Sequence, residues 1–313
     1  MDEIKTKKVF LNKKRKDYIF AYSFLSIAII QFIVFYIVVN INSILLAFQE
    51  VTFENESLVS KFSFAQFERL FRDLANVDSD IRIGLINTIK YFSLNLFIII
   101  PVSLLISYFF SKKILFYKGF RIILFLPSII SGVFFVSMYT VMISKFGPIY
   151  TVLKNLFGYE MPVLLNNDRT ATPTIMFYVF WTGLASNMIL YQGAMNRLPD
   201  EILEAGLLDG IGWARELWSI VLPMIWSTFS ITVVLALANI FMASGPILLF
   251  AEQGGSMGGH KTMTLSFYIF LQTWNGASYE YPAAIGIFFS ICTIPIVFGA
   301  RYFISKLDPE VEY

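Results

Sequence analysis

Four carboxylates lie close together between two long hydrophobic runs. Asp200, Glu201, Glu204 and Asp209 fall within Leu198–Pro223, which interrupts an otherwise apolar part of the chain. Carboxylates near the start of a helix complement the positive end of its dipole. Others can form charge-assisted hydrogen bonds with a basic partner. A chain that crosses a membrane keeps such a segment in water, so we expect a docking surface for another protein here.

This acidic segment is predicted to fold as two short helices with a bend between them. Pro199 suits a first helical position, and Gly210 can adopt the left-handed conformation that closes a helix. We therefore expect the first helix to end at Asp209. Ala205 beside Gly206 would leave a low surface that another protein can approach closely.

A second set of residues places neutral hydrogen-bonding groups and aromatics inside the apolar runs. It consists of Gln31, Asn40, Asn95, Ser131, Trp181, Thr182, Ser186, Asn187, Asn239 and Ser244. Amides and hydroxyls pair with a substrate's hydroxyl groups, and the Trp181 ring can pack on the apolar face of a sugar. These groups suit a neutral polyol. The alternative is that they join transmembrane helices to one another.

Residues for covalent or metal chemistry are scarce. The sequence holds one histidine, His260, and one cysteine, Cys292. Histidine- or cysteine-rich zinc sites and Cys–His nucleophile pairs need more than this. The glycines around His260 lack the spacing of a phosphate-binding loop. We therefore expect no catalytic residues, no metal site and no enzymatic activity in this chain.

The elements that position these residues are predicted to be membrane-spanning helices. Hydrophobic residues make up 57% of 313 and charged residues 15%, with a mean hydropathy of +0.66, which indicates a polytopic membrane protein. Crossing the hydrocarbon takes about 20 helical residues. Six runs are long enough: Ile19–Phe48, Asn87–Phe110, Arg121–Ile143, Thr174–Gln192, Met224–Ala251 and Ala283–Ile304. The sequence thus predicts an all-α fold with six transmembrane helices.

Charge placement indicates orientation and the source of energy. Lys and Arg are more frequent on the side of the two termini, so we expect both termini in the cytoplasm. The net charge of +2 argues against nucleic-acid binding. The helix interiors contain essentially no ionisable groups, which ion-coupled transporters usually need at membrane depth. A transporter of this kind must take its energy from a partner.

The chain is predicted to divide into five segments along its length. They are a basic cytoplasmic tail at 1–18, a first transmembrane helix at 19–48, an outer loop at 49–86, a permease core at 87–304 with a cytoplasmic coupling loop at 193–223, and a cytoplasmic tail at 305–313. Within the outer loop, Ser63 and Gln66 resemble a capping box that opens an amphipathic turn.

The acidic segment resembles the EAA motif, the cytoplasmic coupling loop of binding-protein-dependent ABC importer permeases. The family pattern is E-A-A, three residues, a glycine, nine residues and I-x-L-P. The matching positions are Glu204, Ala205, Gly206, Gly210, Ile220, Leu222 and Pro223, with Asp209 before Gly210 as the usual pair and Gly206 in place of the second alanine. The resemblance implies that Glu204, Ala205, Gly206, Asp209 and Gly210 couple the chain to an ATPase and that Glu204 meets a basic residue there.

The order and spacing of motifs over nearly the whole chain resemble carbohydrate-importer permeases of the maltose and glycerol-phosphate type. They include LINTIKYF, FRIILFLPSI, LPDEILEAG and YPAAIGI. The resemblance implies the type I ABC importer permease fold in a bacterial or archaeal cell (inner) membrane. The implied partners are a second permease subunit, which in the family is often a different chain and otherwise a second copy, two ATP-binding subunits that hold ATP and magnesium, an extracellular solute-binding protein and membrane lipid.

The resemblance also implies where the substrate binds. In maltose-type permeases the sugar lies mid-membrane against the helices before and after the coupling loop. Alignment carries that site to Trp181, Thr182, Gly183, Ser186, Asn187, Ile240, Phe241 and Ser244. Phe241 stands where the maltose system has an amide, which argues against maltose itself. We expect a sugar or oligosaccharide importer. The alternatives are an importer of another solute, because the coupling motif is shared, and a membrane scaffold or enzyme.

Overall fold

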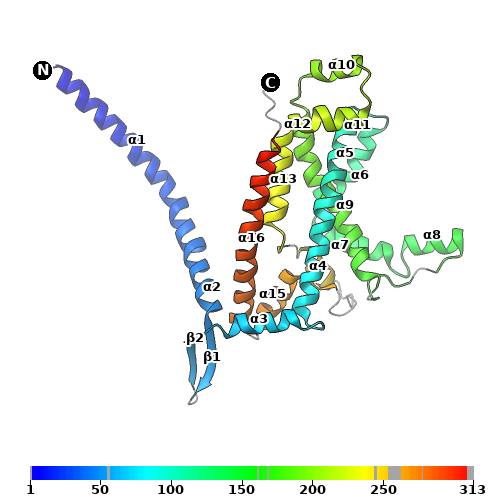
Figure 1. Ribbon diagram of the computed structural model, residues 1–313, viewed down its shortest axis with the longest axis horizontal. Helices are drawn as coiled ribbons and strands as arrows, with labels where there is room; N and C mark the ends of the chain where they lie inside the picture. Colours follow the sequence, from blue (N-terminus) through cyan, green and yellow to red (C-terminus); the bar gives the residue numbers. More distant parts are fainter. Residues whose placement is uncertain are drawn as a thin grey trace. The chain divides into compact units, whose positions relative to one another are not determined.

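The computed structural model describes residues 2–54, 57–160, 162–167, 169–242, 245–252, 262–276 and 278–308. The chain divides into two compact units, which we describe separately. The first comprises Met1–Leu70 and Ser278–Ile287, and the second comprises Phe71–Ala277 and Phe288–Tyr313. Helices dominate both units (Figure 1).

The first unit begins with a long helix made of α1 (Asp2–Phe32), the π-helical η1 (Ile33–Val38) and α2 (Val39–Ala47). The predicted basic tail is therefore already helical from Asp2. Within it, Arg15–Ala47 is long and apolar enough to cross a membrane. Its apolar side chains are mostly exposed, as expected of a helix that meets lipid rather than a protein core.

A β-hairpin follows, which the all-helical prediction missed. β1 (Gln49–Glu54) pairs antiparallel with β2 (Ser57–Phe62), in a register that runs from Gln49 opposite Phe62 to Glu54 opposite Ser57. The base of the hairpin is held by stacking of Phe48 on Phe62, with ring centroids 5.6 Å apart. Such aromatic pairs stabilise a structure beyond their buried area.

The next helix, α3 (Ala65–Ala75), starts at the predicted capping serine. The Ser63 hydroxyl accepts a hydrogen bond from the Ala65 amide at 3.1 Å. Gln66 does not complete a capping box, because the Ser63 amide, which the Gln66 side chain would have to bind, donates to the Phe48 carbonyl at 2.8 Å. The predicted helix start was right, and the predicted reciprocal cap was wrong.

The second unit holds the remaining helices. The first half of the unit is α4 (Asp80–Leu94), η2 (Asn95–Ile99), α5 (Ile100–Ser111), α6 (Tyr117–Ile129), α7 (Gly132–Ile143), α8 (Pro148–Phe157) and α9 (Ala171–Met195). The second half is α10 (Asp200–Leu208), α11 (Trp213–Glu216), η3 (Leu217–Val221), α12 (Leu222–Met224), α13 (Trp226–Ala238), α14 (Gly245–Glu252), α15 (Leu265–Trp274) and α16 (Glu280–Lys306), which starts in the first unit. Among the described residues of the whole chain, five helices could cross a membrane, or six if Trp213–Met224 and Trp226–Ala238 form one bent span.

Two predicted spans are interrupted. The run 121–143 breaks between α6 and α7, where Ile130 and Ser131 are extended, with ψ values of 145° and 132°. The run 224–251 breaks after α13, and a bend of 81° precedes that helix at Ile225. Apolar composition alone therefore located these runs but not their bends.

Two of the π-helical segments come directly before a proline. The Ile100 amide bonds to the Asn95 carbonyl five residues back, one position before Pro101. The Leu222 amide bonds in the same way to the Leu217 carbonyl, one position before Pro223. A proline ring clashes with the carbonyl four residues earlier in a regular α-helix. The wider turn accommodates the ring without ending the helix.

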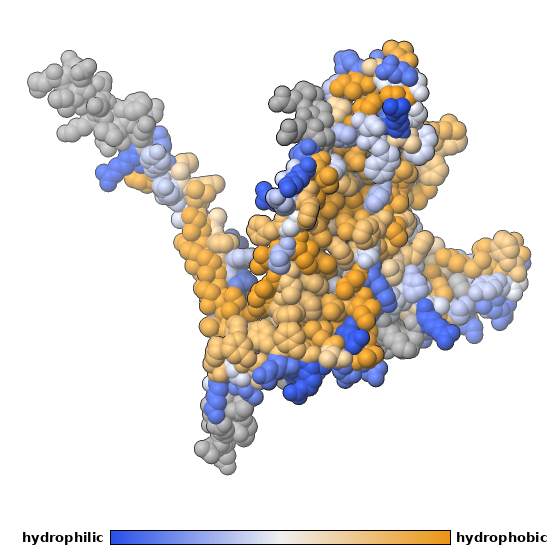
Figure 2. Space-filling view, viewed as in Figure 1, coloured by the Kyte–Doolittle hydropathy of each residue, from blue (hydrophilic) through white to orange (hydrophobic). Residues whose placement is uncertain are grey.

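α9 lies at the centre of the second unit and packs against α5, α6 and α13. Small side chains allow the close approach of α5: the Ser103 hydroxyl donates to the Leu184 carbonyl at 3.3 Å, and the Ser107 hydroxyl donates to the Met188 carbonyl at 3.4 Å. Hydroxyl contacts of this kind are typical between transmembrane helices. Figure 2 shows apolar side chains along α13 and hydrophilic ones mixed in around α10 at the end of the unit.

α15 is bound to α4 by buried polar contacts. The Asn87 amide donates to the Met263 carbonyl at 2.9 Å, and the Leu265 amide donates to the Thr88 hydroxyl at 3.0 Å. Gly84 permits this approach, because a Cβ there would lie 3.2 Å from the Leu265 nitrogen. These contacts fix the middle of α4 and thereby the residues one turn farther along it.

Candidate functional site

The predicted coupling helix is α10. It starts after Pro199, which is extended at the N-cap rather than in the predicted first helical position, and Asp200 and Glu201 lie in the first turn. Its last helical residue is Leu208, with Asp209 as the C-cap, close to the predicted end. Gly210 has a φ of +72°, which is the predicted left-handed closure.

One side of α10 is exposed and combines charge with apolar surface. Glu204 and Ala205 are exposed, and Leu207 and Leu208 are 61% and 89% exposed. Two large leucines on a helix in water are costly unless another protein covers them. This face therefore has the properties of a docking surface.

Gly206 does not belong to that face. It is buried, and a Cβ there would lie 3.1 Å from the Ile220 Cδ1. The Ile211 amide also donates to the Gly206 carbonyl at 3.1 Å. The small residue thus serves the packing of α10 on η3 within this chain, whereas the sequence suggested that it faces a partner.

The segment α11–η3 anchors the coupling helix to the spans. Trp213 packs on Phe109 of α5, with ring centroids 5.5 Å apart. Leu217 and Val221 are buried in a cluster that includes Tyr108 and Tyr191. The predicted coupling segment therefore rests on the C-terminal ends of α5 and α9.

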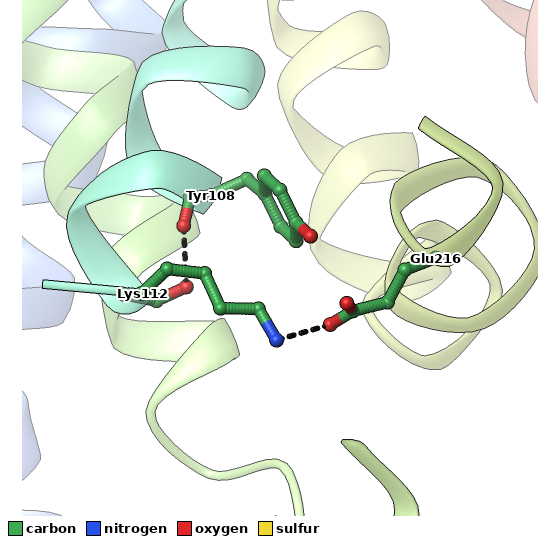
Figure 3. Close-up of polar contacts among 4 residues, drawn as sticks. Tyr108, Lys112 and Glu216 are labelled. Carbon is green, nitrogen blue, oxygen red and sulfur yellow. Dashed lines mark hydrogen bonds and ion pairs between the residues drawn. The ribbon is translucent and has the colours of Figure 1, made fainter. Parts of the chain in front are cut away.

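A buried ion pair lies at the same junction (Figure 3). Lys112 Nζ is 2.5 Å from Glu216 Oε1, and the Glu216 side chain is only 4% exposed. The contact is an ion pair rather than a well-directed hydrogen bond. The Tyr108 ring points to the same carboxylate (Figure 3). The sequence analysis did not single out Glu216, because it falls between the motif positions Gly210 and Ile220 and is not part of the pattern.

A cavity of about 250 Å³ lies between α4, η2, α9 and the loop that follows α13. It is lined by Tyr91, Phe92, Asn95, Ile99, Val179, Gly183, Ala236, Asn239, Ile240, Met242, Pro246 and Ile247. None of these described residues is charged. Mostly apolar walls with a few polar groups are typical of small-molecule sites.

Three polar residues line this cavity, one each from α4, η2 and the end of α13. Asn95 is the first residue of the π-helical η2, a kind of segment often found at functional sites. Tyr91 is 4% exposed, and its hydroxyl has no hydrogen-bond partner among the described residues. The Asn239 amide donates to the Leu235 carbonyl at 2.8 Å, which leaves its own carbonyl oxygen for other contacts.

The eight predicted substrate residues occupy different places. Gly183 and Ile240 line the cavity. Trp181 packs edge-on against Phe135, with centroids 5.3 Å apart, and Phe241 packs against Phe289 at 4.7 Å.

Three of the remaining four do not line the cavity. The Thr182 hydroxyl donates to the Tyr178 carbonyl at 3.0 Å, Ser186 is exposed, and Asn187 is partly buried outside the cavity lining. Ser244 lies outside the described residues. Asn95 and Asn239 were visible in the sequence as amides within apolar runs, and the buried Tyr91 hydroxyl had no such signal.

Comparison with known sequences identifies transport proteins. No family model matches the chain. The protein LplB of Bacillus subtilis (strain 168) is 26% identical over 227 residues, which cover 72% of this chain and 70% of that protein. The arabinooligosaccharides transport system permease protein AraP of the same organism is 24% identical over 288 residues, covering 89% and 85%. The polygalacturonan/rhamnogalacturonan transport system permease protein YteP is also 24% identical, over 230 residues.

Comparison with solved structures decides the fold. A chain in the crystal structure of a bacterial ABC transporter involved in the import of the acidic polysaccharide alginate matches with a TM-score of 0.79. The match covers 95% of this chain and 98% of that chain at 21% identity. The fold is that of an ABC importer permease. The alginate transporter has also been solved in complex with an alginate pentasaccharide-bound periplasmic protein, with the same TM-score.

These likenesses agree with the sequence resemblance. AraP and YteP are permease components of saccharide transport systems, and the chain is a membrane-embedded, multi-pass protein.

Proposed function

We propose that the chain is the permease subunit of an ATP-driven, binding-protein-dependent importer of a sugar or oligosaccharide. The observation that carries the proposal is α10, which presents Glu204, Leu207 and Leu208 at the end of a bundle of apolar spans. A scaffold or a membrane enzyme has no need of an exposed acidic helix with bare leucines. A permease that lacks its own energy source needs such a helix, because it must dock an ATPase.

The coupling residues then divide into two groups. Glu204 and Ala205, with Leu207 and Leu208, enter a groove of an ATPase subunit, where Glu204 meets a basic residue. The second group shapes α10 and its C-terminal closure, and so sets how far the exposed face of α10 extends from the bundle. It consists of Gly206, Asp209 and Gly210. ATP and magnesium belong to that partner.

The other partners follow from the same proposal. A second permease subunit, expected to be a different chain, completes the pathway, two ATPase subunits bind on the cytoplasmic side, and a solute-binding protein delivers the saccharide from outside. We place both termini in the cytoplasm of a bacterial or archaeal cell. In support, α10 and the end of α16 lie at the same end of the second unit (Figure 1).

The saccharide passes the cavity between α4, α9 and the loop after α13. The Tyr91 hydroxyl, Asn95 and Asn239 offer donors and acceptors, and the apolar walls pack against the carbon faces of the sugar rings. The lining lacks a cation among the described residues, so a carboxylate would be desolvated there without compensation. We infer that the transported saccharide is neutral at this point, and Gly183 and Ile240 remain part of its site. Trp181, Thr182, Ser186, Asn187, Phe241 and Ser244 stay predictions from the sequence.

Reconstituted transport tests this function. The chain is co-expressed with its ATPase subunits, second permease and binding protein, and uptake into proteoliposomes that contain ATP is measured for neutral oligosaccharides, uronate oligosaccharides, amino acids and phosphate. We expect ATP-dependent uptake of a neutral oligosaccharide. Uptake of an amino acid or phosphate with no saccharide uptake would favour the alternative importer. Uptake of uronates alone would contradict the neutral cavity.

A further inference from the structure

The buried pair of Lys112 and Glu216 joins two parts of the chain that are 104 positions apart, from Lys112 to Glu216. Lys112 directly follows α5, and Glu216 ends α11 within the coupling segment. Their charged atoms are 2.5 Å apart, with side-chain exposures of 29% and 4%. The Lys112 ammonium also lies 5.7 Å from the centre of the Tyr108 ring, so the pair has an aromatic wall on one side.

The span that ends at Lys112 is the one that carries much of the cavity. α4, η2 and α5 form a single candidate span, Asp80–Ser111. Tyr91, Asn95 and Ile99 line the cavity from its middle. A displacement of the coupling segment that is passed to Lys112 would therefore move the wall against which the saccharide lies.

Separating Lys112 from Glu216 is energetically costly because the carboxylate is buried. Glu216 is buried, so an ionised carboxylate there without Lys112 would lose its hydration and keep only the neutral Tyr108 side chain beside it. The neighbouring Lys113 is exposed, and both lysines border a polar cavity of about 180 Å³ together with Asp200. Water or a second cation can therefore approach the junction, but only Lys112 is paired with the buried carboxylate among the described residues.

We propose that Lys112 and Glu216 form the link that transmits movement of the coupling segment to the α4–η2–α5 span, and so to the cavity. Both are positioning residues, because neither lines that cavity nor lies on the exposed face of α10. The inference rests on the proposed ATP-driven function, since it concerns how that energy reaches the pathway. It adds a second contact to coupling, inside the permease, besides the docking of α10 on the ATPase.

The test measures the cavity directly and needs no identified saccharide. Cys292, the sole cysteine of the sequence, is replaced by Ser, and Asn95→Cys places a reporter in the cavity. The complex with its ATPase subunits is purified, and the rate at which a small methanethiosulfonate reagent labels the reporter is compared with and without ATP and orthovanadate. With the pair intact, trapping the ATPases should change the labelling rate.

The variants separate linkage from folding. In Lys112→Gln and Glu216→Gln we expect the ATP-dependent change in labelling rate to be lost while the ATPase subunits still co-purify. The exchanged pair Lys112→Glu with Glu216→Lys should restore it. Lys113→Gln, which removes the same charge one position away, and Lys154→Gln, which breaks the exposed pair with Glu160, should leave the change intact.

The outcomes are decisive in both directions. A full ATP-dependent change in Lys112→Gln would overturn the proposal. If the single variants fail to assemble, the variant with the exchanged pair decides. Recovery of both assembly and the ATP-dependent labelling change in that variant supports the link. Assembly without the labelling change overturns it. A parent complex whose labelling ignores ATP would instead refute the proposed function.

Discussion

At the scale of single residues, the Tyr91 hydroxyl is the cavity group that we expect to form a hydrogen bond with a ligand. It is buried on the cavity wall and has no partner among the described residues. An unmade buried hydrogen bond costs free energy. Tyr91→Phe should therefore leave the free energy of unfolding unchanged or raise it, while saccharide binding loses about 0.5 to 1.5 kcal/mol. Uptake at limiting saccharide and thermal unfolding in detergent measure the two effects.

Tyr191→Phe is the matched control. Its hydroxyl lies 2.7 Å from the Thr232 hydroxyl and is also buried. Removing it should lower the free energy of unfolding by about 1 kcal/mol with no specific effect at limiting saccharide. If Tyr91→Phe transports as the parent does, the saccharide does not use that hydroxyl.

Glu204 is the residue on which docking of the ATPase should depend most. A charge-assisted hydrogen bond contributes about 1.5 to 3 kcal/mol, and reversal of the charge should cost more because it adds repulsion. In Glu204→Lys we expect the ATPase subunits to be lost during purification and ATP-dependent uptake to fall. Glu201→Lys, in the first turn of the same helix, is the control and should weaken assembly much less. Parental transport by Glu204→Lys would refute this role.

The conformation of the predicted coupling segment followed from the sequence more closely than the lining of the cavity did. The glycine closure at Gly210 depends on local backbone conformation, which is encoded within a few residues, and it was found. Which polar side chains meet in the cavity depends on the rotation of each span about its axis. Thr182 was chosen for its hydroxyl, yet that hydroxyl is occupied by its own helix. Asn239 was recognised as polar but could not be assigned to the cavity without the bend after α13.

At the scale of elements, the contact between α4 and α15 depends on Gly84. A Cβ at Gly84 would meet the backbone of Thr264 and Leu265 at 3.2 Å, which cannot rotate away as a side chain can. Gly84→Ala should therefore lower the free energy of unfolding by about 1 to 3 kcal/mol. Gly119→Ala is the control, because nothing lies within 4 Å of the added Cβ. Equal thermal unfolding of the two variants would contradict the close approach.

The spans were predictable because length and hydropathy suffice to define them. Four of the six predicted runs coincide in position with continuous helical spans of the described chain. The interruptions at Ser131 and after Ala238 were not predictable, because the hydropathy of an apolar run is the same whether its helix is straight or broken. The hairpin at 49–62 was missed for a related reason, since six-residue strands carry little periodic signal.

At the scale of the whole molecule, the scarcity of ionisable groups in the spans predicts the energy source. Uptake should follow internal ATP and should not depend on a pH gradient, because the cavity lining offers no titratable relay at physiological pH among its described residues. Proteoliposomes loaded with ATP and treated with an uncoupler provide the measurement. Loss of uptake on collapse of the gradient would reveal a proton relay elsewhere in the complex.

The π-helical turns before Pro101 and Pro223 have a consequence for chain length. Each holds one residue more than a regular α-helical turn would, so each works as a local insertion whose flanks keep their helical phase. Deleting one residue within 96–98 should leave Tyr91 and Lys112 in their present azimuths. The same deletion within 103–105 would rotate the part of the span after the deletion by about 100° about the helix axis. Lys112 would then move away from Glu216, whereas the cavity wall, which precedes the deletion, would keep its position.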